Sequence, residues 1–229
     1  RMIRGFQIKR RAPNSSAWRV LFWWSVLVRI LGWFFIIVYR YKRHGAENVP
    51  NSGPILIVCN HQSHFDSPLV GYLAIDRPFM SIARDTLFSS GLLSFLMRGF
   101  GVISVRRGDS DTSAIRGAIA ELRSGGSVML FPEGTRSPSG AIGEFQRGVW
   151  MLIRRGGAVV LPVAVEGTYD VWPVGGKIKF RGFVEAAAGK PIPSQELLDL
   201  GEEEGMELLK STIESLRMMC RESIDRRSK

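Results

Sequence analysis

The sequence predicts an α/β fold in which a mostly parallel or mixed sheet of about six to seven strands is flanked by helices. Short apolar runs bounded by Gly, Pro and Asn alternate with stretches of helical periodicity, which is typical of this class. The length of 229 residues suits one domain that buries about 70% of the surface of its unfolded chain. An apolar, Trp-rich segment precedes this pattern and predicts an additional N-terminal helical motif.

The predicted elements follow one another in a regular order. Strands are predicted for the apolar runs at residues 55–59, 79–83, 102–105, 128–131, 158–165 and 178–184. Helices are predicted at residues 68–73, 87–98, 112–123 and 146–155, followed by a long final helix at residues 195–226. We therefore divide the chain into a basic helical docking motif at residues 1–45 and an α/β domain at residues 46–229.

The positive charge of the chain is concentrated near its start. The formal net charge is +10, and residues 1–50 account for +9 of it, with ten Lys or Arg and one acid. The remainder is nearly neutral, so a uniformly basic surface for nucleic acid is excluded. Disorder is excluded because 45% of the residues are hydrophobic. Cys59 and Cys220 are the only cysteines, which excludes a disulfide scaffold.

Residues 20–39 form an almost wholly apolar run. Twenty helical residues would be about 30 Å long, enough for one bilayer crossing. Arg29 lies in the middle of the run, where a charge costs about 2.5 kcal/mol or more. We therefore expect one or two helices lying in one leaflet, with Trp at the interface and basic residues at anionic headgroups. A single crossing and a buried core helix are the alternatives, and a cleaved signal peptide is not expected.

The segment at residues 60–68 contains the first set of chemically useful side chains. It reads Asn-His-Gln-Ser-His-Phe-Asp-Ser-Pro and directly follows a predicted strand. Ser67 and Pro68 predict the N-cap and first residue of a helix, so the segment is a strand-to-helix turn. Such a turn can bring His61 and Asp66 together. Asp66 would then hold one imidazole nitrogen and leave the other free as a general base.

Other roles for this segment remain open. His61, His64 and Asp66 could bind a metal, but His44 is the only other histidine and no cysteine pair supports such a site. The turn could also be purely structural. Cys59 as a nucleophile is disfavoured because it ends an apolar strand, and no Gly-x-Ser-x-Gly motif supports a serine nucleophile. We expect no metal.

The second set follows the predicted strand at residues 128–131. It reads Phe-Pro-Glu-Gly-Thr-Arg at residues 131–136. Gly134 permits close backbone approach, Glu133 can accept hydrogen bonds from hydroxyls, and Arg136 can grip a phosphate with two hydrogen bonds. Arg106 follows a third strand, so these groups are expected to share the carboxyl edge of the sheet. Glycine-rich nucleotide-binding loops are absent from the sequence, and nucleotide hydrolysis is not expected.

Four sequence blocks now resemble those of the glycerolipid acyltransferase family, specifically the bacterial 1-acyl-sn-glycerol-3-phosphate acyltransferases. The blocks are His61 to Asp66, Gly101 to Arg106, residues 131–136 and the Leu-Pro-Val-Ala-Val at residues 161–165. They occur in the family order, and the Phe-Pro-Glu-Gly-Thr-Arg block matches at all six positions. Together the blocks are far more specific than any one of them.

The resemblance implies transfer of a fatty acyl group from an acyl thioester to the sn-2 hydroxyl of 1-acyl-sn-glycerol 3-phosphate (lysophosphatidic acid), forming phosphatidic acid. His61 would be the general base and Asp66 would orient it. The residues implied in substrate binding are Arg84, Arg106, Glu133, Gly134, Thr135 and Arg136. No cofactor is implied, because acyl-CoA or acyl carrier protein serves as co-substrate.

The resemblance also implies a membrane location, at the cytoplasmic face of the inner membrane, with residues 1–45 lying on one leaflet or crossing once. The partners would be membrane lipids, lysophosphatidic acid and the acyl donor, with acyl carrier protein as one candidate donor. Alternative acceptors are a lyso-ornithine lipid, another lysophospholipid and glycerol 3-phosphate. A non-catalytic, membrane-tethered lipid-binding protein is the alternative from a different class.

Overall fold

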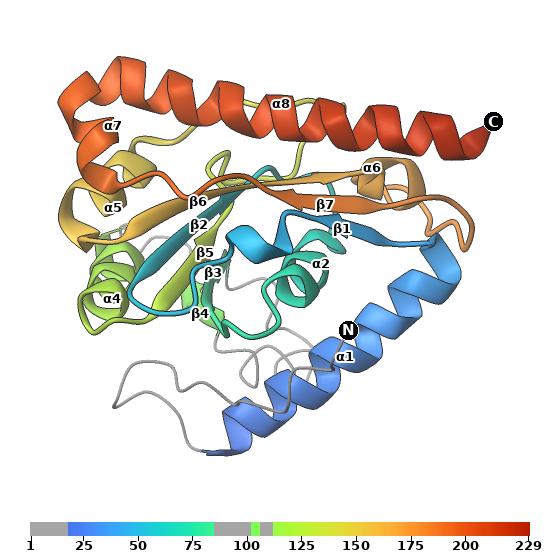
Figure 1. Cartoon of the computed structure of the whole chain (residues 1–229), viewed down its shortest axis with the longest axis horizontal. Coiled ribbons are helices and arrows are strands. Elements are labelled where there is room, and N and C mark those ends of the chain that lie inside the picture. Colours follow the sequence, from blue (N-terminus) through green and yellow to red (C-terminus); the bar gives the residue numbers. More distant parts are fainter. Residues whose placement is uncertain (1–17, 85–101, 106–111) are drawn as a thin grey trace.

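The computed structural model describes residues 18–84, 102–105 and 112–229. Within these residues, seven strands form one sheet in the order β1-β7-β6-β2-β5-β3-β4 (Figure 1). The strands are β1 Lys42–His44, β2 Ile55–Cys59, β3 Met80–Arg84, β4 Val102–Val105, β5 Ser127–Leu130, β6 Val159–Glu166 and β7 Glu185–Ala188. The predicted α/β fold with a mixed sheet is confirmed.

Five neighbouring strands of the sheet run in the same direction. β2 lies between β6 and β5 and pairs in parallel with both, with Ile55 opposite Val159 on one side and Ser127 on the other. β3 continues this parallel arrangement from β5 to β4. β7 is antiparallel to β6, and β1 runs parallel to β7. The segments that leave the carboxyl ends of β2 and β5 are therefore neighbours at one edge of the sheet.

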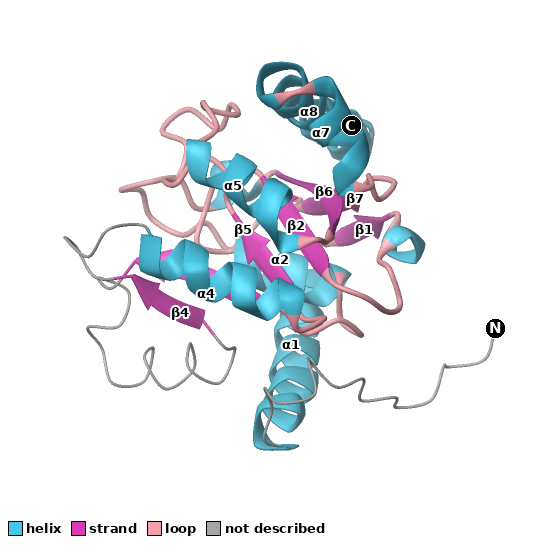
Figure 2. Cartoon of the chain, turned by 90° about the vertical axis from the view of Figure 1, so that its left-hand side faces the viewer, coloured by secondary structure: helices cyan, strands magenta, loops and turns pink. Residues whose placement is uncertain are grey.

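Helices cover both faces of the sheet. They are α1 Trp18–Tyr39, α2 Asp66–Leu73, α4 Thr112–Arg123, α5 Arg147–Gly156, α6 Thr168–Val171, α7 Ser194–Leu200 and α8 Glu202–Ser228, with a 3₁₀ turn at Ala46–Asn48. Because side chains alternate along a strand, Ile55 and Ile57 of β2 join the core formed with α1 and α2. Leu56 and Val58 point the other way, into the core formed with α4, α5, α7 and α8 (Figure 2).

The strand predicted at residues 178–184 is wrong. This segment is a loop, exposed at residues 178–181, and the strand of that region is β7, which begins at Glu185. Basic residues alternate with Ile178 and Phe180 in a strand-like pattern, but these two apolar side chains face solvent. The true strand has three alanines, which have weak strand propensity, and burial against β6 and α8 fixes it instead.

Other differences from the prediction concern the bounds of two helices and one strand that was not predicted. The long final helix is divided at Gly201, whose φ of 86° interrupts the helix between α7 and α8. α2 begins at Asp66, so Ser67 is not its N-cap and Pro68 is its third residue; a missing N–H is tolerated in the first turn. β1 was not predicted, because three polar residues carry no strand pattern. The predicted helix at residues 87–98 lies outside the described residues.

α1 has two different faces. Trp24, Val28 and Phe35 are buried against the domain, so this face belongs to the core. On the opposite face Trp33 is 61% exposed and Ile37 is 74% exposed. Figure 2 shows the helix extending away from the sheet and its covering helices. None of the helices in the described part of the chain combines the length and the apolar character that a bilayer crossing requires.

Gly32 allows α1 to pack closely on α2, and this contact gives a test of the interface. A Cβ at this position would lie 2.1 Å from the Tyr72 ring. Gly32→Ala should therefore lower the free energy of unfolding by roughly 1–3 kcal/mol, measured by urea denaturation, although Ala ordinarily stabilises a helix. In a Tyr72→Ala background the same change should no longer destabilise. An equal loss in both backgrounds would contradict this packing.

Candidate active site

The turn between β2 and α2 is folded around the carboxylate of Asp66. Its Oδ2 accepts three hydrogen bonds, from Nδ1 of His61 at 2.8 Å and from the amides of Gln62 at 2.6 Å and Ser63 at 2.7 Å. Among the described residues its Oδ1, which is also buried, has no hydrogen-bond partner. The structure thus brings together the two residues predicted to form the catalytic pair, because the chain folds back over the carboxylate.

The imidazole of His61 is held in one plane. It stacks on the Phe131 ring with a centroid separation of 3.7 Å and an interplanar angle of 8°. The side chain is 18% exposed, and the described residues provide no hydrogen-bond partner for Nε2. With Nδ1 donating to Asp66, neutral His61 has a lone pair on Nε2 that can accept a proton. This is the arrangement required of a general base.

Glu133 supports the same turn from the end of β5. Its buried carboxylate accepts a hydrogen bond at 3.0 Å from the backbone amide of His61, and another from the amide of Gly143. Burial raises the pKa of this carboxyl, and the two amides oppose the change only in part. Glu133 therefore anchors the backbone of His61. Its predicted contact with substrate stays a prediction.

The rest of the Phe-Pro-Glu-Gly-Thr-Arg block forms an exposed turn beside His61. Gly134 has a φ of 68°, and its amide donates to the Phe131 carbonyl at 3.1 Å. Gly134 and Thr135 are exposed, and Arg136 is half-buried. The amide of Ser137 donates to the His61 carbonyl at 2.7 Å, which ties the block to the turn between β2 and α2.

Arg136, the predicted phosphate contact, is half-buried at the end of this block. In the described residues no carboxylate forms an ion pair with Arg136. Its charge is close enough to His64 to affect that side chain. Burial, followed by the charge of Arg136, lowers the pKa of His64. Of the other predicted cations, Arg84 ends β3 at the same edge of the sheet, whereas Arg106 lies outside the described residues.

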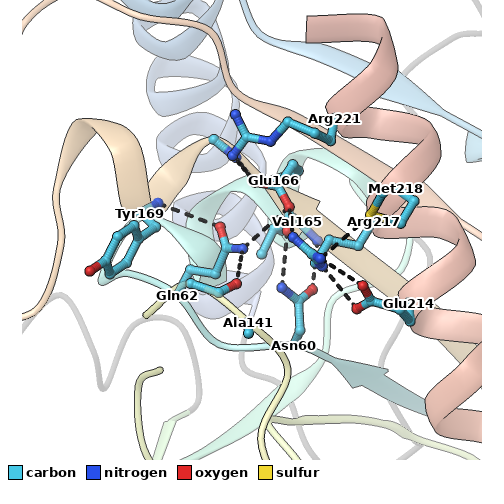
Figure 3. Close-up of polar contacts among 12 residues, drawn as sticks. Asn60, Gln62, Ala141, Val165, Glu166, Tyr169, Glu214, Arg217, Met218 and Arg221 are labelled. Atoms are coloured by element: carbon cyan, nitrogen blue, oxygen red, sulfur yellow. Dashed lines mark hydrogen bonds and ion pairs between the residues drawn. The ribbon is translucent and has the colours of Figure 1, made fainter. Parts of the chain in front are cut away.

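Two polar residues that support the turn were missed by the sequence analysis. Asn60 is buried, and its amide side chain bonds both the carbonyl and the N–H of Val165, at 3.0 and 2.8 Å. Glu166 is completely buried at the end of β6, within a network of polar contacts (Figure 3). A carboxylate that ends an eight-residue buried strand requires buried partners. The position of Glu166 at the end of an apolar run was therefore the signal that could have identified it.

One group of side chains in the described residues has atoms close enough to bind a metal ion. Ligand atoms of His44, Glu185 and Cys220 lie within 4.8 Å of one another, on β1, β7 and α8. Glu185 already accepts hydrogen bonds from His44, Ser223 and Arg227. Burial raises the pKa of the Cys220 thiol, which favours the protonated form over the metal-binding thiolate. Because the hydrogen bonds of Glu185 are already made within the protein, we interpret these three residues as a structural cluster, separate from the β2 turn.

Comparisons with known proteins agree with this geometry. A family model described as Acyltransferase matches residues 40–166, more than half of the chain. A chloroplastic 1-acyl-sn-glycerol-3-phosphate acyltransferase of Arabidopsis thaliana is 32% identical over 167 residues, covering 70% of this chain and 46% of that protein. A lyso-ornithine lipid O-acyltransferase of Pseudomonas aeruginosa is 30% identical over 161 residues, covering 63% and 61%. The chain spans about half the length of the plant relatives it matches.

A solved structure shares the fold. The crystal structure of the 1-acyl-sn-glycerophosphate acyltransferase from Thermotoga maritima aligns with a TM-score of 0.69 and 27% sequence identity. The alignment covers 86% of this chain and 79% of that one. The similarity therefore extends beyond the segment matched by the family model.

The raised pKa of Glu133 predicts a pH dependence of stability. The folded state binds this proton more tightly, so its contribution to stability is complete below the unfolded pKa and is lost as pH rises through the folded pKa. The free energy of unfolding of the wild type relative to Glu133→Gln should therefore fall as the pH rises above the usual pKa of a glutamate side chain, about 4.5. Urea denaturation across this range measures it, with exposed Glu144→Gln as control. A difference that rises with pH would contradict the prediction.

Proposed function

Since the chain belongs to the acyltransferase family, we propose that it transfers a fatty acyl group from a thioester to the sn-2 hydroxyl of 1-acyl-sn-glycerol 3-phosphate, forming phosphatidic acid. The names of its relatives and of its structural neighbour support this acceptor. The observation that carries the proposal is the His61–Asp66 pair, in which Nε2 of His61 has no hydrogen-bond partner among the described residues. Either acyl-CoA or acyl carrier protein could supply the acyl group.

His61 would act as the base in the first step. The acceptor oxygen forms a bond to the thioester carbonyl carbon while its proton passes to Nε2 of His61. Asp66 stabilises the resulting imidazolium through the hydrogen bond to Nδ1, and Phe131 keeps the ring in plane. The tetrahedral intermediate then collapses with cleavage of the carbon–sulfur bond. The proton on Nε2 passes to the departing sulfur, which regenerates neutral His61.

The acceptor phosphate would lie against Arg136, with Arg84 and Arg106 as further proposed contacts. A guanidinium can donate two parallel hydrogen bonds to a phosphate, and Arg136 has no competing carboxylate among the described residues. The exposed backbone of Gly134 and Thr135 allows the substrate to approach closely. A lyso-ornithine acceptor is the second candidate, favoured by the lyso-ornithine lipid relative. Parallel assays with both acceptors distinguish the two.

His61→Ala should abolish transfer, with a loss of roughly a thousandfold or more in kcat, because the proposed mechanism has no other base to accept the hydroxyl proton. The assay follows phosphatidic acid formation from lysophosphatidic acid and acyl-CoA. His64→Ala is the matched control, since no hydrogen bond joins its ring to Asp66, and it should retain far more activity. Full activity in His61→Ala, or equal losses in the two variants, would reject His61 as the base.

We also propose that the chain works at an anionic membrane surface, through the exposed face of α1 and the loop at residues 173–183. The loop carries the exposed apolar residues Val174, Ile178 and Phe180, the last 72% exposed, between Lys177, Lys179 and Arg181. It adjoins α1, because the Val184 amide bonds the Tyr39 carbonyl. Apolar side chains among basic ones suit the interface of an anionic bilayer.

This docking surface lies next to the catalytic turn. Trp172, directly before the loop, contacts the ring of Phe65 with centroids 4.8 Å apart, and Phe35, on the buried face of α1, contacts the same ring at 5.1 Å. The proposed location is the cytoplasmic face of the inner membrane.

Trp33→Ser combined with Ile37→Ser should weaken binding to vesicles that contain phosphatidylglycerol by roughly tenfold, because two apolar side chains no longer leave water. Cosedimentation of the full chain measures the partition. Leu200→Ser removes an apolar side chain that is exposed on α7, away from this surface, and serves as the control. Unchanged binding by the double variant would show that docking depends on other residues.

A further inference from the structure

Glu166 is a completely buried carboxylate that the proposed chemistry does not use. Its Oε2 forms an ion pair with Nη1 of Arg217 at 2.7 Å, and its Oε1 forms one with Nη2 of Arg221. The amide of Gly167 also donates to Oε1, at 2.9 Å. Both arginines come from α8, so this helix closes the network over the end of β6 (Figure 3).

Gln62 lies on the other side of Glu166, and both the nitrogen and the oxygen of its side-chain amide form hydrogen bonds. Nε2 donates to the Gly140 carbonyl at 2.8 Å and to Oε2 of Glu166 at 3.4 Å. Oε1 accepts from the Thr168 hydroxyl at 3.1 Å and from the Tyr169 amide at 3.4 Å. Because four groups surround it, the side chain of Gln62 is fixed in one orientation (Figure 3).

The same residue takes part in the catalytic turn through its backbone. The Gln62 amide donates at 2.6 Å to the Asp66 oxygen that also holds Nδ1 of His61. Residues 60–65 form neither strand nor regular helix. Their geometry therefore depends on such individual hydrogen bonds and not on a repeating backbone pattern.

We propose that Glu166, Arg217 and Arg221 form a positioning network that, through Gln62, fixes the placement of His61. This inference rests on the proposed acyl transfer. None of the three residues touches the reacting atoms. They act on the general base through the turn that carries it.

The energetics favour a positioning role over simple stabilisation. Buried ion pairs contribute little net stability compared with apolar replacements of similar volume, because both charges must lose water. A small displacement of a catalytic group, by contrast, can cost about a hundredfold in rate. Each arginine is also held by a second acid, Arg217 by Glu214 at 2.6 Å and Arg221 by Asp170 at 2.8 Å. These additional ion pairs restrict the movement of the guanidinium groups.

Arg217→Met in the full chain tests the proposal. On vesicles, with lysophosphatidic acid and acyl-CoA, kcat should fall roughly tenfold while both KM values stay within about twofold. Arg226→Met is the control, because Arg226 is exposed on the same helix and should leave kcat unchanged. Arg217→Lys, which keeps the charge, should recover part of the loss. Combining Arg217→Met with Gln62→Ala should be no worse than Gln62→Ala alone, since both act through one chain of contacts.

A spectroscopic measurement separates this inference from the proposed function. The sequence has only three histidines, so the proton on Nδ1 of His61 can be assigned by NMR with the help of His61→Ala. Its downfield signal should broaden or shift in Arg217→Met and stay unchanged in Arg226→Met. Inactivity of the wild type with either donor would reject the acyl transfer, and the NMR signal would still test the network. An unchanged signal and kcat, with only a lower Tm, would overturn the positioning role.

Discussion

One oxygen of Asp66 accepts hydrogen bonds from an imidazole and from two backbone amides, and the geometry of the site depends on this arrangement. A short segment without regular secondary structure cannot hold a histidine in a fixed position by itself. The charge of the carboxylate compensates for this, because hydrogen bonds to an ionised acceptor are short and strong. The interaction that orients the proposed base thus also shapes the backbone that carries it. A change at Asp66 would therefore affect both the orientation of His61 and the fold of the turn.

The sheet supplies the second requirement, which is the proximity of two distant segments. β2 and β5 are parallel neighbours, so the turn with His61 and the block with Glu133 and Arg136 emerge side by side. The contacts between them are reciprocal: Glu133 accepts from the His61 amide, and the Ser137 amide donates to the His61 carbonyl. Residues that sequence patterns assign to substrate binding can therefore have a structural role as well.

The sequence predicted those parts of the structure that follow from local patterns. Ile55–Cys59 is a continuous apolar run bounded by turn residues, and it is the central strand of the sheet. β7 escaped prediction because its alanines lack strand propensity and the pairing with β6 fixes them. Glu166 escaped for a similar reason: its partners lie more than fifty residues further along the chain, on α8. The local sequence can show that such a carboxylate needs a partner but not which residue supplies it, whereas the His61 and Asp66 pairing required only a turn.

The position of α8 has a consequence for the order in which the protein is completed. Arg217 and Arg221 neutralise Glu166, and Arg227 of the same helix neutralises Glu185 at the start of β7. A ribosome makes these arginines after every strand of the sheet. Until α8 emerges, Glu166 lacks both arginines and Glu185 has His44 of β1 but not Arg227, and burying carboxylates without their countercharges is unfavourable. The ion pairs of Glu166, like the apolar core that contains Leu209 and Ile213 of α8, are therefore complete only when this helix docks.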